Sequence, residues 1–184
     1  YRFVRLSVSE CSEIGSEVAP FAVQLNEFKV FNYQNTTDEF PSYSAVAHTY
    51  RASTDFASTQ GNEHWSYMRQ GDLNIGQSYF WSPLSYNTQM NAWGKSGLYN
   101  YVGNNWMHPD ENFQTARIWK VPADGIIHIT GRISKKDTAG GNGVRAKILR
   151  DREQIWPLDS EWMTISYNDA VGVNVDCGIA VNAN

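Results

Sequence analysis

The second half of the chain alternates apolar with polar residues, and this period of two restricts the fold more than any other feature. The clearest runs are 127–133, 144–148 and 171–175, where most apolar residues are separated by a polar residue or glycine. Such alternation sends neighbouring side chains to opposite faces of a strand. No segment sustains the 3.6-residue period of a capped helix. Short strands separated by turn signals every 8–12 residues or so predict an all-β fold, an antiparallel β-sandwich of jelly-roll type.

The N-terminal part carries two further strand patterns. Residues 1–8 are rich in β-forming residues, and residues 21–33 alternate with one phase slip near Asn26, which indicates a β-bulge. A polar, loop-rich stretch follows from 34 to 64. The sequence therefore divides into N-terminal strands over 1–33 and an aromatic-rich β-sandwich module over 34–184.

Charge and apolar runs exclude two classes of partner. The chain has 15 Lys and Arg residues against 19 Asp and Glu residues, a net charge of −4. A protein that binds nucleic acid through its phosphates needs a basic face, so no nucleic-acid partner is expected. The apolar runs are far shorter than the roughly 20 residues of a membrane-spanning helix, so no membrane insertion is expected.

Composition also indicates a compartment. Only 18% of the residues are charged, which is typical of a secreted β-protein with Ser, Thr, Asn and Gly on its surface. No signal peptide is visible, and residue 1 opens a strand-like stretch. We therefore expect a mature or excised piece of an extracellular or cell-surface protein.

Aromatic residues supply the candidate binding site. The chain holds 7 Trp, 10 Tyr and 8 Phe, many of them within 64–108 among glycines and few charges. An aromatic ring attracts the weakly positive C–H face of a sugar, while amide, carboxylate and guanidinium groups bind its hydroxyls. The candidate stacking rings are Trp65, Tyr67, Trp81, Trp93, Tyr99 and Trp106, and the candidate hydrogen-bonding residues are Arg69, Asp72, Asn74, Asn104, Asn105 and Asp110.

The alternative for each ring is a place in the hydrophobic core. Trp119 lies within an alternating strand, and we expect it to be buried. Trp65 and Tyr67 are two residues apart and share one face of a strand, which is either core or binding surface. Trp93 and Trp106 stand beside glycine or asparagine, as loop residues do.

Cysteine and acidic residues assign no metal site. Cys11 and Cys177 either form one disulfide that closes a very long loop or remain buried free thiols, and we favour the free thiols. No Cys-x-x-Cys pair or Cys/His cluster indicates zinc. Oxygen ligands for a structural calcium ion are present without an EF-hand spacing, so calcium stays open and no cofactor is assigned. These ligands are Asp137, Asn142, Asp151, Asp159, Glu161 and Asp169.

A catalytic function is the first rival of saccharide binding, and a structural one is the second. A glycosidase needs two carboxylates across a cleft, and a β-fold lyase would use tyrosine, histidine and a basic residue. The candidates are Glu63, Asp72, Asp110 and Glu111 for the former, and His64, His108, Tyr67 and Arg69 for the latter. Their spacing singles out no catalytic set, and 108–111 is interpreted as a turn with a structural histidine. A surface or fibre subunit would instead exchange strands between chains.

Several spaced segments resemble one family. Residues 56–67 read Phe-Ala-Ser-Thr-Gln-Gly-Asn-Glu-His-Trp-Ser-Tyr, and Trp106-Met107-His108-Pro109, 116–125 and 141–148 follow in order. They resemble β-sandwich modules appended to bacterial glycoside hydrolases and polysaccharide lyases, over about residues 50–184. This resemblance implies a carbohydrate-binding jelly roll.

The N-terminal strands resemble a second family. Residues 1–6 and 23–31 are similar to the closing strands of a discoidin-like domain, a type that also binds sugars in carbohydrate-active enzymes. Residues 1–33 are then either the end of such a domain or part of the same sandwich. We expect a non-catalytic module that binds polysaccharide or glycan and is tethered to other modules, since tethering raises its effective concentration.

Overall fold

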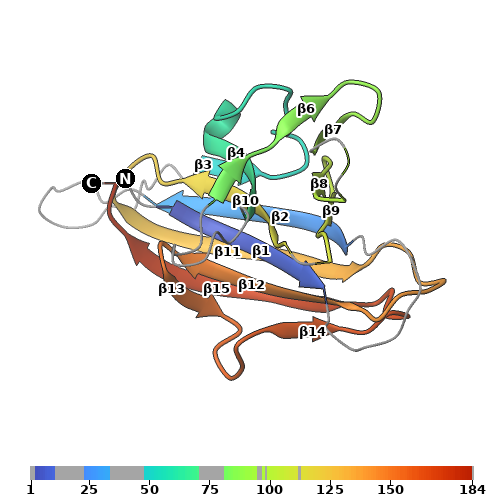
Figure 1. Cartoon of the computed structure of the whole chain (residues 1–184). Coiled ribbons are helices and arrows are strands. Elements are labelled where there is room, and N and C mark those ends of the chain that lie inside the picture. Colours follow the sequence, from blue (N-terminus) through green and yellow to red (C-terminus); the bar gives the residue numbers. More distant parts are fainter. Residues whose placement is uncertain are drawn as a thin grey trace, which may run out of the picture.

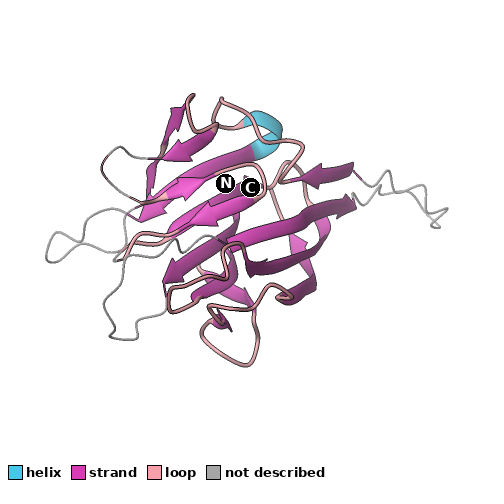
Figure 2. Ribbon diagram, turned by 90° about the vertical axis from the view of Figure 1, so that its right-hand side faces the viewer, coloured by secondary structure: helices cyan, strands magenta, loops and turns pink. Residues whose placement is uncertain are grey.

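The computed structural model describes residues 3–10, 23–33, 48–70, 81–94, 97, 99–111 and 113–183. These residues form fifteen β-strands and one short 3-10 turn, Asn62–His64. The pairings given for these strands are all antiparallel. Figures 1 and 2 show the strands stacked in layers. The prediction of an all-β antiparallel sandwich is confirmed.

The strands belong to two sheets. Sheet A has the order β13 (Glu153–Trp156), β12 (Val144–Arg150), β1 (Phe3–Glu10), β10 (Thr115–Lys120), β4 (Trp65–Gln70) and β5 (Trp81–Pro83), with β14 (Met163–Ile165) also pairing with β12. Sheet B has the order β15 (Val173–Val181), β11 (Gly125–Lys135), β2 (Val23–Tyr33), β9 (Trp106–His108), β8 (Tyr101–Val102), β7 (Ala92–Gly94) and β6 (Ser85–Asn87), with β3 (His48–Arg51) also pairing with β2.

The two N-terminal strands lie inside these sheets. β1 pairs with β10 on one side and with β12 on the other. β2 pairs with β11 on one side and with β3 and β9 on the other. Both strands therefore contribute to the same sandwich as the rest of the described chain.

The hydrophobic core follows the alternation of the strands. Val4, Leu6 and Val8 of β1 are buried, as are alternate residues of β11 and β12. Burying a side chain of this size stabilises the fold by about 1.5–3 kcal/mol. The predicted run 171–175 has both ends misplaced, because β15 spans Val173–Val181 and Val171 is 68% exposed.

The predicted bulge near Asn26 is confirmed. Thr130 of β11 pairs with Lys29, whereas Arg132 pairs with Asn26, so the register shifts by one residue between the two pairs. The shift places two residues of β2 opposite one residue of β11, which is the geometry of a β-bulge. None of the described residues forms a helix long and apolar enough to cross a membrane.

Candidate functional site

Three of the predicted stacking rings are core residues. Trp65 and Tyr67 are 1% exposed and Trp93 is 5% exposed. β4 turns alternate side chains between the sheets, where the Tyr67 ring stacks on Trp93 with centroids 5.3 Å apart. Arg69, two residues further along β4, is buried for the same reason. The prediction that these four residues offer an open binding surface is therefore wrong.

Trp119 behaves as predicted, whereas two other candidates cannot be placed. Trp119 is fully buried in the core, as its alternating strand indicated. Asp72 and Asn74 lie outside the described residues.

Four rings come together on the outer face of β8 and β9, and we call Tyr99, Tyr101, Trp106 and His108 the aromatic face. Tyr101 pairs directly with His108. The next pair along these strands is Val102 with Met107, and both residues are fully buried in the core. Alternation therefore turns Tyr101, Trp106 and His108 away from the core. Tyr99 stacks against His108 with ring centroids 5.8 Å apart and an interplanar angle of 28°.

Two glycines make room for the rings. A Cβ atom on Gly103 would lie 2.1 Å from Nε1 of Trp106, and a Cβ atom on Gly94 would lie 2.0 Å from Cδ1 of Tyr101. Each ring therefore occupies the space that a side chain at the glycine would fill. This use of glycine was not visible in the sequence, where the same residues indicated turns.

Tyr99 is held in place although its side chain is 59% exposed. Its backbone N–H donates to Oδ2 of Asp110 at 2.8 Å, and its ring rests on His108. His108 is buried, and its Nδ1 lies 2.6 Å from the carbonyl oxygen of Pro109. Burial lowers the pKa of His108, so the imidazole is neutral at pH 7. These contacts fit the predicted turn with a structural histidine.

Hydrogen bonds fix the backbone beneath the aromatic face. Asn100 is fully buried, and its Nδ2 donates to the carbonyl oxygen of Phe113 at 3.0 Å and to Oγ1 of Thr115 at 2.9 Å. Oγ1 of Thr115 donates in turn to the carbonyl oxygen of His108 at 2.9 Å. The segment that carries the two tyrosines is thus bonded to β9 and β10.

Arg117 holds the turn that leads into Trp106. Its fully buried guanidinium donates to the carbonyl oxygens of Ala52 and Gly103, and to that of Asn104 at 3.1 Å. Burial lowers the pKa of Arg117 to about 10. Sequence reasoning did not assign this role, although an arginine in phase with Trp119 on an alternating strand is a signal for it.

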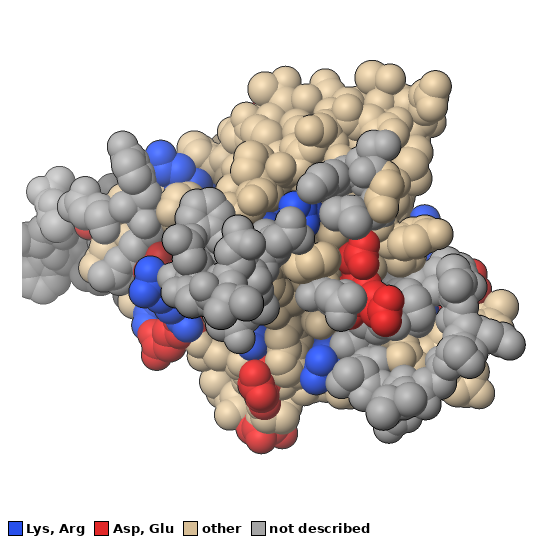
Figure 3. All heavy atoms as spheres, viewed as in Figure 1, with Lys and Arg blue, Asp and Glu red and all other residues tan. Residues whose placement is uncertain are grey.

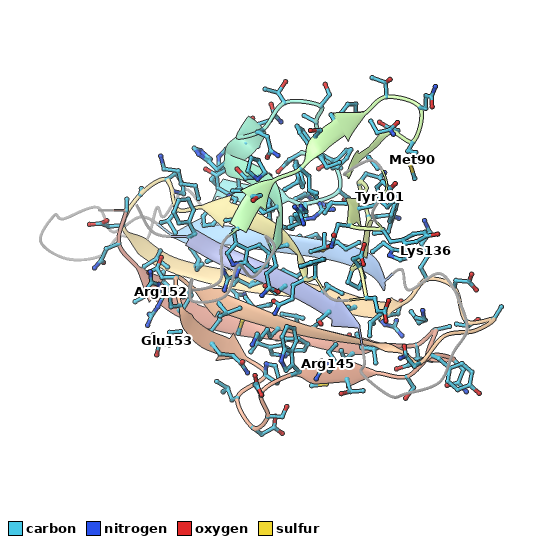
Figure 4. All side chains as sticks on the ribbon, in the orientation of Figure 1. Met90, Tyr101, Lys136, Arg145, Arg152 and Glu153 are labelled. Carbon is cyan, nitrogen blue, oxygen red and sulfur yellow. The ribbon has the colours of Figure 1, made fainter. Side chains whose placement is uncertain are left out.

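Polar groups surround the aromatic face. Asn104 is exposed and Asn105 is half-buried, and both lie in the turn before Trp106. Nζ of Lys136 lies 4.5 Å from the centroid of the Trp106 ring. Figure 4 labels Tyr101 and Lys136 on the same side of the molecule.

The remaining ring lies elsewhere. Trp81 is on β5 of sheet A, where Cζ of Arg5 is 4.5 Å from its ring centroid. Of the predicted site, the structure therefore brings together Tyr99, Trp106 and Asn105, with Tyr101 as an addition.

The candidate metal ligands do not converge. Over the described ranges, no three His, Cys, Asp or Glu side chains are placed to hold a metal ion. Three of the acidic candidates instead accept backbone hydrogen bonds: Asp137 from Ala139 at 2.9 Å, Asp151 from Phe3 at 2.9 Å and Asp169 from Gly172 at 2.7 Å.

Cys177 is a half-buried free thiol, and burial raises its pKa to about 11. Its candidate partner, Cys11, lies outside the described residues.

The candidate lyase residues do not share a surface. Tyr67 and Arg69 are in the core, and His108 lies beneath Tyr99. His64 is half-buried and packs edge-on against Tyr50, with ring centroids 5.5 Å apart.

Comparison of the chain with protein-family models, with curated proteins and with solved structures found no match.

Proposed function

We propose that the aromatic face binds a saccharide chain without cleaving it, as a module of a larger extracellular or cell-surface carbohydrate-active protein. The observation that carries this proposal is Tyr99, a residue that is 59% exposed and whose ring is yet backed by the ring of His108. A water-facing ring that is already held loses little conformational entropy when a flat ligand stacks on it. Tyr101 and Trp106 extend the same face over Gly94 and Gly103.

Amide groups beside the aromatic face favour a ligand rich in hydroxyls. Asn104 and Asn105 offer amide groups, which donate to and accept from hydroxyls. On the side shown in Figure 3, Lys and Arg as well as Asp and Glu are scattered among the described residues. Stacking with a few hydroxyl hydrogen bonds gives modest affinity, which tethering to another module would raise through effective concentration.

Two ring deletions with one matched control test the proposal. Tyr99→Ala and Trp106→Ala should each weaken binding of a neutral oligosaccharide at least tenfold, measured by calorimetry after a glycan array has identified a ligand. Tyr167→Ala removes a ring that is 49% exposed in the turn before β15, and it should leave affinity unchanged. Circular dichroism should show that all three variants remain folded.

Three outcomes would contradict the proposal. One is an affinity that does not change in Tyr99→Ala and Trp106→Ala. Another is the appearance of reducing ends or unsaturated products, which would favour a lyase or glycosidase. A concentration-independent polymer with no saccharide affinity would favour a structural subunit that exchanges strands.

A further inference from the structure

The outer face of sheet A gathers basic and indole side chains, and we call Arg5, Arg145, Lys147, Trp81 and Trp162 the basic face. Alternate residues of β1 and β12 are buried in the core, namely Val4, Leu6, Val8, Val144, Ala146 and Ile148. The residues between them, Arg5, Arg145 and Lys147, therefore project from the opposite side of the sheet.

Strand register brings the three cations within reach of one another. Lys147 pairs with Ser7, two residues after Arg5, and Arg145 pairs with Ser9. Residues two apart on one strand are separated by about 7 Å, and neighbouring strands by about 5 Å. Burial lowers the pKa of Lys147, Glu161 opposes that shift, and Arg5 and Arg145 lower the pKa further. The three cations therefore lie close enough to repel one another on a partly dehydrated surface.

An indole ring lies against each of the three cations of the basic face. Nζ of Lys147 lies 4.0 Å and Cζ of Arg145 lies 5.5 Å from the ring centroid of Trp162. Cζ of Arg5 lies 4.5 Å from the ring centroid of Trp81. Because β10 and β4 separate β1 from β5, the side chains of Arg5 and Trp81 must extend across the sheet to meet.

Polar groups on the basic face keep unused hydrogen-bonding capacity. Ser7 is fully buried and lies on this face between Arg5 and Lys147, and its Oγ has no hydrogen-bond partner among the described residues. Nε of Arg5 is also buried without a partner there. The carboxylate of Glu161 is 4.0 Å from Nζ of Lys147 and offsets part of the repulsion, although its side chain is 83% exposed.

We propose that the basic face is a second binding site, for a saccharide that carries carboxylate or sulfate groups. An oxyanion would neutralise the repulsion between Arg5 and Lys147, and the two indole rings would stack on the sugars beside it. A nucleic acid fits less well, because its dense phosphates require an extended basic surface, whereas charges of both signs are mixed on the side shown in Figure 3. Figure 4 places Arg145 apart from Tyr101 and Lys136, so this site is separate from the aromatic face and does not depend on it.

Paired charged and uncharged ligands test the proposal. Calorimetry at low salt would compare oligogalacturonate with its methyl ester, and dextran sulfate with dextran. At least one acidic saccharide should bind, and its uncharged counterpart should bind at least tenfold more weakly. A single-stranded oligonucleotide, polyglutamate and inorganic sulfate serve as the other anions, and each should bind at least tenfold more weakly than that saccharide.

Variants with a matched control locate the site. Lys147→Gln and Arg5→Gln should each weaken the acidic saccharide about tenfold. Lys136→Gln removes the corresponding cation over Trp106 and should change this affinity less than twofold. Should Arg5→Gln fail to fold, Lys147→Gln and Trp162→Ala carry the test. Lys147→Gln removes a charge that repels its neighbours, so we expect this variant to stay folded.

Each remaining outcome overturns the proposal. These outcomes are no binding of either acidic saccharide, equal binding of the uncharged counterparts, equal binding of the oligonucleotide or polyglutamate, and a loss in Lys136→Gln as large as in Lys147→Gln. The aromatic face is tested separately, because Trp106→Ala should weaken binding of the neutral oligosaccharide at least tenfold and leave affinity for the acidic saccharide within twofold.

Discussion

Replacing Arg117 with methionine should destabilise the fold by about 3 kcal/mol. The carbonyl groups of Ala52 and Gly103 belong to buried residues and would lose their donor, at about 2 kcal/mol each. Asn104 is exposed, so its carbonyl regains water. About 1 kcal/mol of stability is regained, because the variant no longer buries a charge without a counter-ion. The total stability of a domain is about 5–15 kcal/mol, so the variant remains folded.

Urea unfolding at pH 7 measures this loss, as a lower midpoint at an unchanged slope. The melting temperature should fall by about 6–12 °C, given 2–4 °C per kcal/mol at this length. Arg117→Lys keeps the charge but its single ammonium cannot span the same carbonyls, so we expect an intermediate loss. Arg132→Met is the matched control, because Arg132 is a half-buried arginine whose Nε also donates to one carbonyl oxygen, that of Val171.

The reasoning is refuted if Arg117→Met stays within about 0.5 kcal/mol of the wild type, or if Arg132→Met loses as much stability. The variant also tests whether the hydrogen bonds of Arg117 position Trp106. If the turn of Gly103 and Asn104 relaxes, affinity for the neutral oligosaccharide falls together with stability. Lower stability at full affinity would show that Arg117 supports the core alone.

Two further predictions concern Gly103 and Cys177. Gly103→Ala should displace the Trp106 indole by more than about 1 Å, since a Cβ atom would lie 2.1 Å from Nε1, and saccharide affinity should fall about tenfold. Gly178→Ala is the control, because a Cβ atom there makes only an ordinary contact, 3.9 Å from the carbonyl oxygen of Ile127. Equal saccharide affinity of the two variants in calorimetry would contradict this prediction. In a Cys11→Ser variant, alkylation of Cys177 at pH 8 should be about 100-fold slower than in urea, because a raised pKa leaves less thiolate. The pKa of Cys177 is about 11 in the folded protein and 9.0 in the ordinary thiol, so the free energy of unfolding should fall as the pH rises from 9 toward 11. Urea midpoints of this variant that do not change with pH would argue against burial of the thiol.

Alternation was enough to predict the sheets, because apolar residues at every second position have few other ways to be buried. The same reasoning located the bulge at Asn26, where one extra residue restores the phase. It misplaced both ends of the last strand, at 171 and 175 instead of Val173 and Val181, since alternation alone does not show where a strand joins or leaves the sheet.

The site was harder to predict, because a period of two shows which residues share a face but not what covers that face. Trp65 and Tyr67 were correctly placed together, yet only the packing of sheet B against β4 makes their face the core. Tyr99 and Trp106 project from the opposite surface of sheet B. The space over Gly103 and the hydrogen bonds of Arg117 depend on residues distant in the chain, and no local pattern encodes them.

The position of β1 at the middle of sheet A has a consequence for how the protein is made. Its two neighbours, β10 and β12, are encoded more than a hundred residues later. A ribosome has therefore to deliver the chain past Arg150 before the first strand acquires both partners. Such distant pairing slows folding, and the hydrogen-bonding edges of the early strands stay open to other nascent chains in the meantime.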